Sequence, residues 1–183
     1  MSYEILNINK KLRLVQLMPK QAVKLFELTD KNREYLSSFL PWVSNVKTVD
    51  DSREYIMQTL KNRTEGKAYT YGIELDGIIV GDINLRGLKD MNQQAIIGYW
   101  IDAAQSGRGL TTKAVHALTN FGIGTLGLDK IILRASPDNI ASNRVAEKVG
   151  YVFSNQIVED GNTLNIWIAD KKVFNLSSEN VTG

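Results

Sequence analysis

The sequence predicts an α/β domain with a mixed β-sheet. Of the 183 residues, 43% are hydrophobic and 23% are charged, which suits one compact domain with a proper core. Two apolar runs meet at Asp76-Gly77, the strongest short hairpin signal in the chain. Residues 94–149 then read strand, helix, strand, helix. This order of elements indicates a mixed sheet. Because no repeat, linker or low-complexity segment interrupts the chain, we treat residues 1–183 as a single domain.

The N-terminal part combines a hairpin with helices. Tyr3–Ile8 and Lys11–Leu17 alternate apolar and polar residues about Asn9-Lys10, which predicts the hairpin. A helix begins at Pro19, a residue that suits the first helical turn, and continues towards Lys31. Two further helical segments are Tyr35–Leu40, which ends before Pro41, and a helix that begins at Val49-Asp50-Asp51-Ser52 and closes at Gly66.

The middle of the chain alternates between strands and helices. Strands are expected at Ala68–Leu75, Ile78–Arg86, Gln94–Ile101 and Lys130–Ser136. Helical spacing runs from Leu110 to Phe121. A second helix, Ile140–Val149, is capped by Pro137-Asp138-Asn139 and ends at Gly150, where a left-handed residue belongs.

The C-terminal part is predicted to be a hairpin and a tail. Tyr151–Val158 and Thr163–Ala169 pair across residues 159–162. The exposed strand of this hairpin offers an edge for a homodimer. We expect Lys171–Gly183 to be a frayed tail.

Charge balance and rare residue types narrow the function. The net charge of +2, from 22 basic and 20 acidic residues, argues against a nucleic-acid surface or a membrane patch. Residues 1–17 show no signal-peptide pattern, so we expect a cytoplasmic protein. The chain has no cysteine and one histidine, His116. This excludes an acyl-cysteine intermediate, a Cys/His zinc site and any Ser/His/Asp relay without His116. We therefore expect no metal and a reaction that passes directly between two bound substrates.

The stretch from Ile96 to Thr119 joins a strand, a glycine loop and a helix. Its apolar run ends at Ile101, and residues 105–109, Gln-Ser-Gly-Arg-Gly, precede the helix. The first amides of a helix have no partner within it, and the helix dipole adds partial positive charge there. Gly107 and Gly109 let the backbone approach a phosphate without a side chain in the way. The pattern predicts an anion site, with a plain strand-to-helix turn as the alternative.

A dinucleotide-binding Rossmann loop is a competing interpretation of Gly107-x-Gly109. That loop needs a third small residue, but Thr112 stands there. It also needs an acid at the end of the next strand, whereas Asp129 precedes that strand. We therefore reject this interpretation.

A second signature follows the glycine loop. Residues 139–151 read N-x-x-S-x-x-x-x-E-K-x-G-aromatic, and IGYWI (97–101) and LPWV (40–43) lie upstream. Together these motifs resemble the GNAT acetyltransferase superfamily, and within it the RimJ/RimL-like branch of ribosomal-protein N-terminal acetyltransferases. The resemblance covers roughly Lys11 to Asp170. It implies a mixed, mostly antiparallel sheet of about seven strands flanked by helices. It also implies that the fourth and fifth strands, here Gln94–Ile101 and Lys130–Ser136, splay apart around acetyl-CoA.

The same resemblance implies a set of contacts with acetyl-CoA. The pantetheine arm would pair with Trp100 and Ile101 like an added strand. The cofactor-binding residues are expected to be Trp100, Ile101, Gly107, Arg108, Gly109, Leu110, Thr111, Asn139 and Asn143, with the amides of residues 107–111 holding the pyrophosphate. The loop departs from the usual Gln/Arg-x-x-Gly-x-Gly/Ala pattern, because Ser106 stands in its first place and Thr111 in its last, unless Gln105 serves one position early.

The acid that protonates the leaving thiolate is expected to be Ser142. Many relatives place a tyrosine where Ala146 stands, which leaves Ser142 as the best hydroxyl near the sulfur. A helix first-turn hydroxyl is its alternative role. Trp42 and Tyr99 are expected to line the acceptor site, although Trp42 also suits a core anchor.

The general base is open at this point. Relatives often carry a strand glutamate where Ile96 stands, and a water chain to Asp82, Glu159 or Asp160 is one replacement. An α-amine titrates near ~8 and lysine near ~10.4, so deprotonating lysine costs about 3 kcal/mol more at neutral pH. The resemblance implies an acetyl-CoA-dependent N-acetyltransferase, and the missing carboxylate base favours the α-amine of a protein or peptide as its acceptor. A small-molecule amine as acceptor and a non-catalytic acyl-CoA-binding module are the alternatives.

Overall fold

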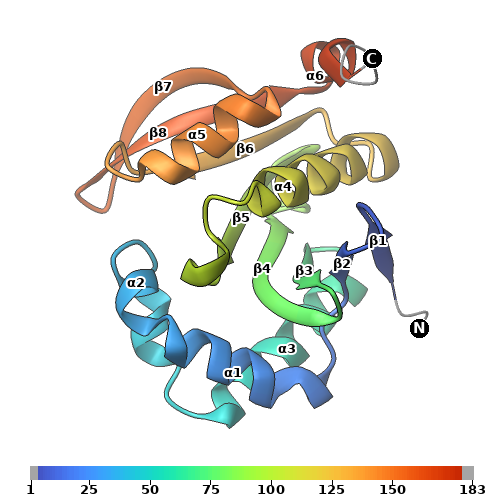
Figure 1. Ribbon diagram of the computed structural model, residues 1–183. Coiled ribbons are helices and arrows are strands. Elements are labelled where there is room, and N and C mark those ends of the chain that lie inside the picture. Colours follow the sequence, from blue (N-terminus) through green and yellow to red (C-terminus); the bar gives the residue numbers. More distant parts are fainter. Residues whose placement is uncertain (1–3, 179–183) are drawn as a thin grey trace.

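One eight-stranded sheet forms the centre of the computed structural model, which describes residues 4–178 (Figure 1). Its strands lie in the order β1-β2-β3-β4-β5-β6-β8-β7. They are β1 (Ile5–Asn7), β2 (Leu12–Val15), β3 (Ala68–Leu75), β4 (Ile78–Arg86), β5 (Gln94–Ile101), β6 (Lys130–Ala135), β7 (Val152–Glu159) and β8 (Asn162–Asp170). All neighbours are antiparallel except β5 and β6, which are parallel. The predicted mixed, mostly antiparallel sheet is confirmed, with eight strands rather than about seven.

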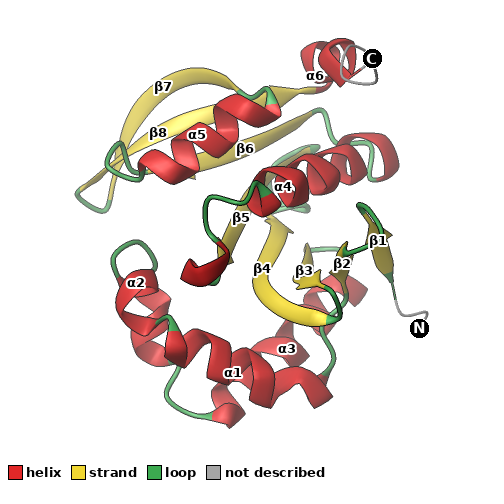
Figure 2. Ribbon diagram, viewed as in Figure 1, coloured by secondary structure: helices red, strands yellow, loops and turns green. Residues whose placement is uncertain are grey.

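Helices cover both faces of the sheet (Figure 2). They are α1 (Ala22–Lys31), α2 (Arg33–Ser37), α3 (Val49–Thr64), α4 (Leu110–Asn120), α5 (Ile140–Val149) and α6 (Lys171–Ser178). The larger hydrophobic core joins the sheet to α4 and α5 through residues such as Leu118 and Ala146. A smaller core on the opposite face joins α1, α2 and α3 to Leu17 and Trp100. The sheet therefore separates two helical layers.

Local sequence signals explain where several elements begin and end. The side chain of Thr48 accepts a hydrogen bond from the Asp51 amide, and Asp51 caps the Thr48 amide in return, which starts α3. Asp76 and Gly77 both have positive φ, 49° and 84°, as the two-residue turn between β3 and β4 requires. Gly150 ends α5 with φ of 95°. These predicted boundaries are confirmed.

The C-terminal segment differs from its prediction. Residues 171–178 form α6 rather than part of a frayed tail. The side chain of Phe174 is only 2% exposed and packs at the rings of His116 and Tyr151, and this burial stabilises the helix against the domain. Residues 179–183 lie outside the described residues, as does Tyr3 at the start of the first predicted strand.

Strands β5 and β6 separate along their length. They pair from Gln94 with Lys130 as far as Ile97 with Leu133. Beyond this point β5 pairs only with β4, and β6 only with β8. The predicted splay is therefore present, and on the side that faces β6 the backbone of Gly98–Ile101 has no strand partner among residues 4–178.

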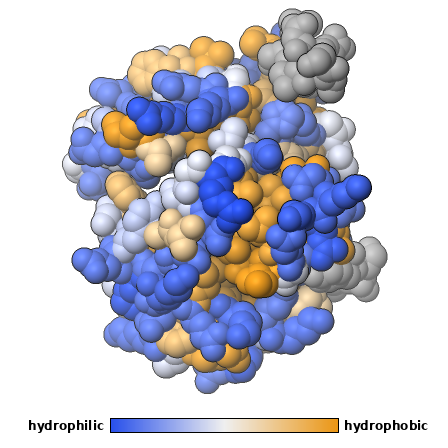
Figure 3. Space-filling model, in the orientation of Figure 1, coloured by the Kyte–Doolittle hydropathy of each residue, from blue (hydrophilic) through white to orange (hydrophobic). Residues whose placement is uncertain are grey.

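The face of the molecule seen in Figure 3 is mainly polar. In Figure 3 hydrophilic residues dominate the helices, and hydrophobic residues gather near the centre of the view, where β4 runs. Within residues 4–178 there is no helix with the length and apolar character needed to cross a bilayer.

Strand β7 lies at the edge of the sheet and exposes Val152, Phe153 and Val158. The homodimer through this edge remains a prediction.

Candidate active site

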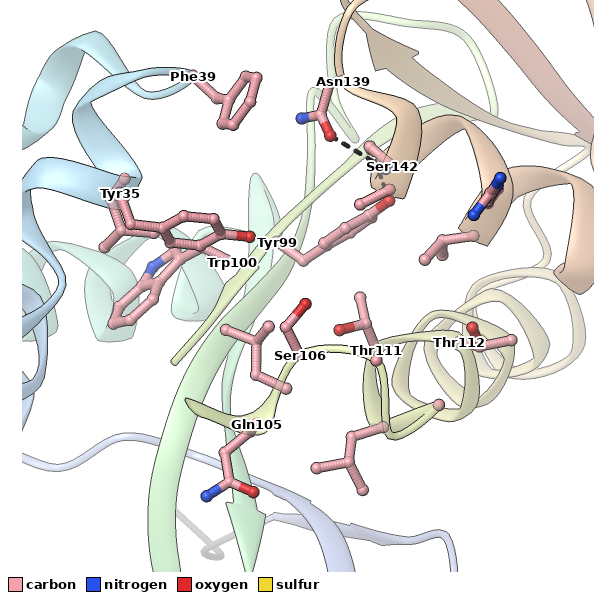
Figure 4. A pocket seen from close by; sticks show the side chains of 18 of the residues that line it. Tyr35, Phe39, Tyr99, Trp100, Gln105, Ser106, Thr111, Thr112, Asn139 and Ser142 are labelled. Carbon is pink, nitrogen blue, oxygen red and sulfur yellow. Dashed lines mark hydrogen bonds between the residues drawn. The ribbon is translucent and has the colours of Figure 1, made fainter. Parts of the chain in front are cut away.

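A cleft of about 390 Å³ opens where β5 and β6 part, and we call it the splay cleft (Figure 4). Its walls come from the end of β5, the loop before α4, the N-terminal turns of α4 and α5, and the segment around α2. Of the residues predicted to bind acetyl-CoA or to act on it, those that line it are Trp100, Ile101, Gly107, Gly109, Leu110, Thr111, Asn139 and Ser142. Residues separated by more than forty positions in the sequence thus meet at one opening.

The loop before α4 presents unpaired backbone amides. Gly107 and Gly109 have φ of 75° and 74°, and Gly109 caps α4 without a side-chain hydrogen bond. Within the described part of the chain, no protein group accepts a hydrogen bond from the amides of residues 107–112. A Cβ added at either glycine would meet nothing within 4 Å, so backbone conformation rather than crowding requires glycine here. The loop therefore has free backbone amides at a helix N-terminus, the geometry that an anion site requires, and we call residues 107–112 the amide cradle.

Arg108 does not line the splay cleft. Its exposed guanidinium donates to the side-chain oxygen of Gln105. The approach of Arg108 to the pyrophosphate therefore remains a prediction that rests on its place in the loop.

Ser142 is held by two neighbours. The side-chain oxygen of Asn139 accepts a hydrogen bond of 3.1 Å from the Ser142 amide, which starts α5. The hydroxyl oxygens of Tyr99 and Ser142 lie 2.8 Å apart (Figure 4). Burial raises the pKa of Tyr99 to about 12, so Tyr99 stays protonated at neutral pH. When Tyr99 donates to Ser142, the Ser142 proton is free to point into the cleft.

Asn143 has a different place from the one expected. Its side-chain amide donates to the carbonyl oxygens of Ser136 and Asn139, each at 2.9 Å. Its side-chain oxygen accepts from Asn165 and from the Trp167 indole. Asn143 thus ties α5 to β8 and does not line the splay cleft. Its predicted contact with the coenzyme has no support in this geometry, because its polar atoms are already engaged.

A second cavity of about 700 Å³ lies on the opposite side of β5, and we call it the α3 pocket. It extends between α3, the sheet and the residues after α2, and Leu40, Tyr99 and Trp100 line both this pocket and the splay cleft. Trp42 also lines it, 39% exposed, with its ring 6.3 Å from that of Trp100. Trp42 is therefore a pocket wall rather than a core anchor.

The α3 pocket contains a buried carboxyl group. Asp82 on β4 is 1% exposed and accepts a hydrogen bond of 3.1 Å from the Tyr55 hydroxyl of α3. Burial raises the pKa of Asp82 to about 7, although hydrogen bonds from Tyr55 and Asn84 oppose this shift. The side-chain oxygen of Asn84 is itself buried and has no hydrogen-bond partner in the described part of the chain. Asp82 can therefore exchange a proton near neutral pH.

Sequence reasoning named Asp82 only as one of three remote bases and missed Tyr55. A signal existed, because Asp82 is the single acidic residue in the apolar strand Ile78–Arg86, and a carboxyl group inside such a strand is rarely buried without a purpose. The other two suggested bases do not line either cavity, since Glu159 pairs with Arg134 and Asp160 forms the turn before β8.

Comparison with known proteins identifies the family. Residues 11–152 match the family described as "Acetyltransferase (GNAT) domain". The chain belongs to the GNAT acetyltransferase family. The expectation drawn from the loop and the Asn139–Tyr151 motif is thereby confirmed, and this GNAT protein is an N-acetyltransferase that uses acetyl-CoA.

Individual GNAT relatives are ribosomal-protein acetyltransferases or bear related names. The chain is 30% identical over 146 residues to a putative ribosomal N-acetyltransferase, YdaF, of Bacillus subtilis. The matched region covers 79% of this chain and 80% of the relative. It is 26% identical over 149 residues to the ribosomal-protein-serine acetyltransferase of Escherichia coli, with 81% and 83% covered. The solved structure of RimL, a ribosomal L7/L12 α-N-protein acetyltransferase in complex with coenzyme A, has the same fold. The TM-score is 0.86 at 22% identity, with 91% of this chain and 98% of that one covered.

Residues 4–178 contain no group of three or more His, Cys, Asp or Glu side chains that could hold an ion.

Proposed function

We propose that this acetyltransferase moves an acetyl group from acetyl-CoA directly to the α-amine of a protein or peptide N-terminus, with ribosomal proteins as the acceptor class. The observation that carries the proposal is the convergence of three features at the splay cleft. These are the unpaired edge of β5, the amide cradle of residues 107–112 and the hydroxyl of Ser142.

The splay cleft fits the parts of acetyl-CoA in sequence. The cradle amides and the N-terminus of α4 suit the pyrophosphate. The unpaired backbone of Trp100 and Ile101 suits the amide groups of the pantetheine arm, which can pair with a strand edge. From there the thioester would reach the parting of the strands, where Ser142 and Tyr99 stand.

Ser142 is proposed to protonate the leaving thiolate. Tyr99 remains protonated, because burial raises its pKa to about 12, and it can donate to the Ser142 oxygen. The N-terminal turn of α5 adds partial positive charge at the same place, which stabilises negative charge on sulfur or oxygen. Ser142 therefore has the Tyr99 hydroxyl as a hydrogen-bond donor and lies in the positive electrostatic field of the α5 N-terminus.

The acceptor class rests on the chemistry of the amine and on the relatives. An α-amine of pKa near ~8 loses its proton more readily than a lysine of pKa near ~10.4. The E. coli relative is named for acetylating ribosomal-protein serine, and the structural relative is a ribosomal L7/L12 α-N-protein acetyltransferase. The α3 pocket, of about 700 Å³, gives room for the first residues of a chain.

Thiol release with matched peptides tests the proposal. The protein is mixed with acetyl-CoA and with peptides whose free N-terminus is serine or alanine, and mass spectrometry locates the acetyl group. We expect thiol release and acetylation at the N-terminus, and no reaction when that N-terminus is blocked and only lysine is free. A preference for lysine, a polyamine, a free amino acid or an aminoglycoside would contradict the acceptor assignment. Thermal stabilisation by coenzyme A without thiol release from any amine would indicate a binding module.

A further inference from the structure

Asp82 differs from the other buried acidic residues. In the described region three acidic side chains are buried: Glu74, Asp82 and Asp102. Glu74 pairs with Arg13, and Asp102 pairs with Lys31 at 2.8 Å. Among residues 4–178 Asp82 has no basic partner within 4 Å, and it accepts hydrogen bonds from the Tyr55 hydroxyl and from Asn84 instead. A buried carboxylate without a cation is costly, so its place in the wall of a large pocket points to a cation that arrives from outside.

We infer that the α3 pocket binds the acceptor as its ammonium ion, and that the Asp82 carboxylate, oriented by Tyr55, takes the proton that the acceptor nitrogen must lose. This inference rests on the proposed function and assigns the base that the strand glutamate supplies in many relatives. Asp82 is then a catalytic residue, since it touches the acceptor, and Tyr55 is a positioning residue.

The register of the sheet places Asp82 beside the path to the thioester. Asp82 on β4 is directly opposite Trp100 on β5, and Trp100 lines both the α3 pocket and the splay cleft. The next position on this face of β5 is Gly98, which also lines the pocket. A Cβ at Gly98 would lie 2.8 Å from the Arg86 guanidinium, so glycine at this position lets the Arg86 side chain lie against β5.

The charged groups around Asp82 leave room for an ammonium ion. Tyr55 faces Asp82 from α3, and Arg86 lies on the same strand, where burial and the charge of Arg134 lower its pKa. Asp51 and Glu54 of α3 line the same pocket and add negative charge towards its α3 side. Trp100 faces it from β5 without a charge. Because Arg86 forms no ion pair with Asp82, an incoming ammonium ion can pair with the ionised form of this carboxyl group.

The proton balance suits an α-amine better than lysine. The pKa of Asp82 is raised to about 7, and an α-ammonium ion has a pKa of ~8. Proton transfer from the α-ammonium ion to Asp82 is therefore unfavourable by a factor of only about 10. For a lysine of pKa near ~10.4 the same transfer is more than a thousandfold unfavourable. The pocket therefore selects for the acceptor class of the proposed function.

Each atom of the transfer has a destination. The acceptor R–NH₃⁺ gives one proton to the Asp82 carboxylate, which becomes a neutral acid and later releases it to solvent. The nitrogen lone pair forms a C–N bond with the thioester carbon, and the C–S bond breaks with its electron pair on sulfur. Ser142 gives its hydroxyl proton to that sulfur and recovers a proton from the new amide nitrogen. The products are the acetylated amine, the free thiol of coenzyme A and one proton.

Three variants test the inference with acetyl-CoA and a panel of amines. The panel contains glycinamide, tripeptide amides that begin with serine and alanine, and N-acetyl-lysine amide. Asp82→Asn keeps size but cannot accept the proton, and Tyr55→Phe keeps the carboxyl but removes its donor. Asp76→Asn makes the same chemical change in the exposed turn of the same hairpin, outside both cavities, and is the control.

Turnover and its pH dependence give the readout. We expect Asp82→Asn to lose at least about 100-fold in kcat, with acetyl-CoA affinity equal to that of Asp76→Asn. Wild-type kcat/KM should increase with pH, with a midpoint near pH 7. This midpoint should be the same for two accepted amines of different basicity, because it reports Asp82 rather than the amine. Tyr55→Phe should move this midpoint to higher pH, because Tyr55 stabilises the ionised carboxyl.

Other outcomes overturn the inference. Equal turnover by Asp82→Asn and Asp76→Asn removes Asp82 from the mechanism, and so does a midpoint that follows the basicity of the amine. Loss of acetyl-CoA affinity together with turnover in Asp82→Asn would assign a structural role. A wild-type protein that binds acetyl-CoA and releases no thiol with any amine overturns the proposed function as well.

Discussion

The hydroxyl oxygens of Tyr99 and Ser142 lie 2.8 Å apart, although 43 residues separate them in the sequence. Tyr99 stands on β5 just after its pairing with β6 ends, and Ser142 stands on the first turn of α5. This contact bridges the parting of the two strands. It places a protonated donor, a hydroxyl and a helix N-terminus at the point where the thioester is proposed to lie.

Ser142→Ala should lower turnover far more than acetyl-CoA affinity. We expect a drop of about 10- to 100-fold in kcat, because loss of a general acid costs at least this much when the thiolate must find a proton elsewhere. The dissociation constant for acetyl-CoA should change by less than about threefold. Calorimetric titration and thiol release measure the two quantities. Ser154→Ala, at an exposed position of β7, is the control, and an equal effect on both quantities would remove Ser142 from the mechanism.

Tyr99→Phe should act through Ser142. The ring remains in place, but the hydroxyl that contacts Ser142 is lost, so kcat should fall by about tenfold. In the Tyr99→Phe, Ser142→Ala double variant, the loss should be close to that of Ser142→Ala alone, since the two hydroxyls work as one unit. Additive losses in a double-mutant cycle would show that Tyr99 acts independently.

Gly109→Ala should weaken acetyl-CoA binding and destabilise the fold. Gly109 has φ of 74° at the N-cap of α4, and alanine in that conformation costs about 1–2 kcal/mol. A local shift would also disturb the amide cradle, so we expect at least a tenfold loss of affinity by titration. Gly124→Ala is the matched control, because its Cβ also meets nothing within 4 Å but its φ is not positive. Unchanged affinity in Gly109→Ala would argue against the cradle.

Asp82→Asn should raise stability above neutral pH. The pKa of Asp82 rises from 3.8 to about 7 on folding, so the unfolded chain ionises first as the pH increases. Wild-type stability from this group is full below pH ~3.8, falls as the pH rises towards 7, and then stays constant. The whole effect is up to about 4 kcal/mol.

Urea unfolding at pH 5 and pH 8 measures this effect. The free energy of unfolding of Asp82→Asn minus that of the wild type should be larger at pH 8. A difference that is equal at both pH values would show that Asp82 titrates normally in the folded protein.

Phe174→Ala should destabilise the domain. Phe174 is 2% exposed in the larger core, and truncation of such a ring costs about 3–5 kcal/mol. Val173→Ala, next to it and with Val173 53% exposed, should change stability by less than about 1 kcal/mol. Thermal unfolding of both variants measures the contrast, and equal melting temperatures would show that α6 contributes little.

Local chemistry explains which parts could be predicted from the sequence. Asp76-Gly77 and Gly150 mark a turn and a helix end because their φ values are possible for few residues. The glycine loop before α4 predicts free amides for the same local reason. The family motif at Asn139–Tyr151 then indicates the coenzyme site. These features depend on neighbours within a few residues, so the order of strands and helices could be predicted from them. The family resemblance, carried by the motifs, added the splay of the two strands.

Tertiary structure decided the features that depend on burial and on distant partners. Phe174 is in a sequence that suits a frayed tail, but the space beside Tyr151 buries its ring and orders α6. Trp42 lines the α3 pocket because its ring packs near that of Trp100. Asn143 links α5 to β8 because its side chain accepts a hydrogen bond from Asn165. Asp82 shows the reason most clearly. The sequence determines that it is a carboxyl group on a strand, whereas the removal of water and the Tyr55 hydroxyl from α3 set its pKa, and only the folded chain brings these together.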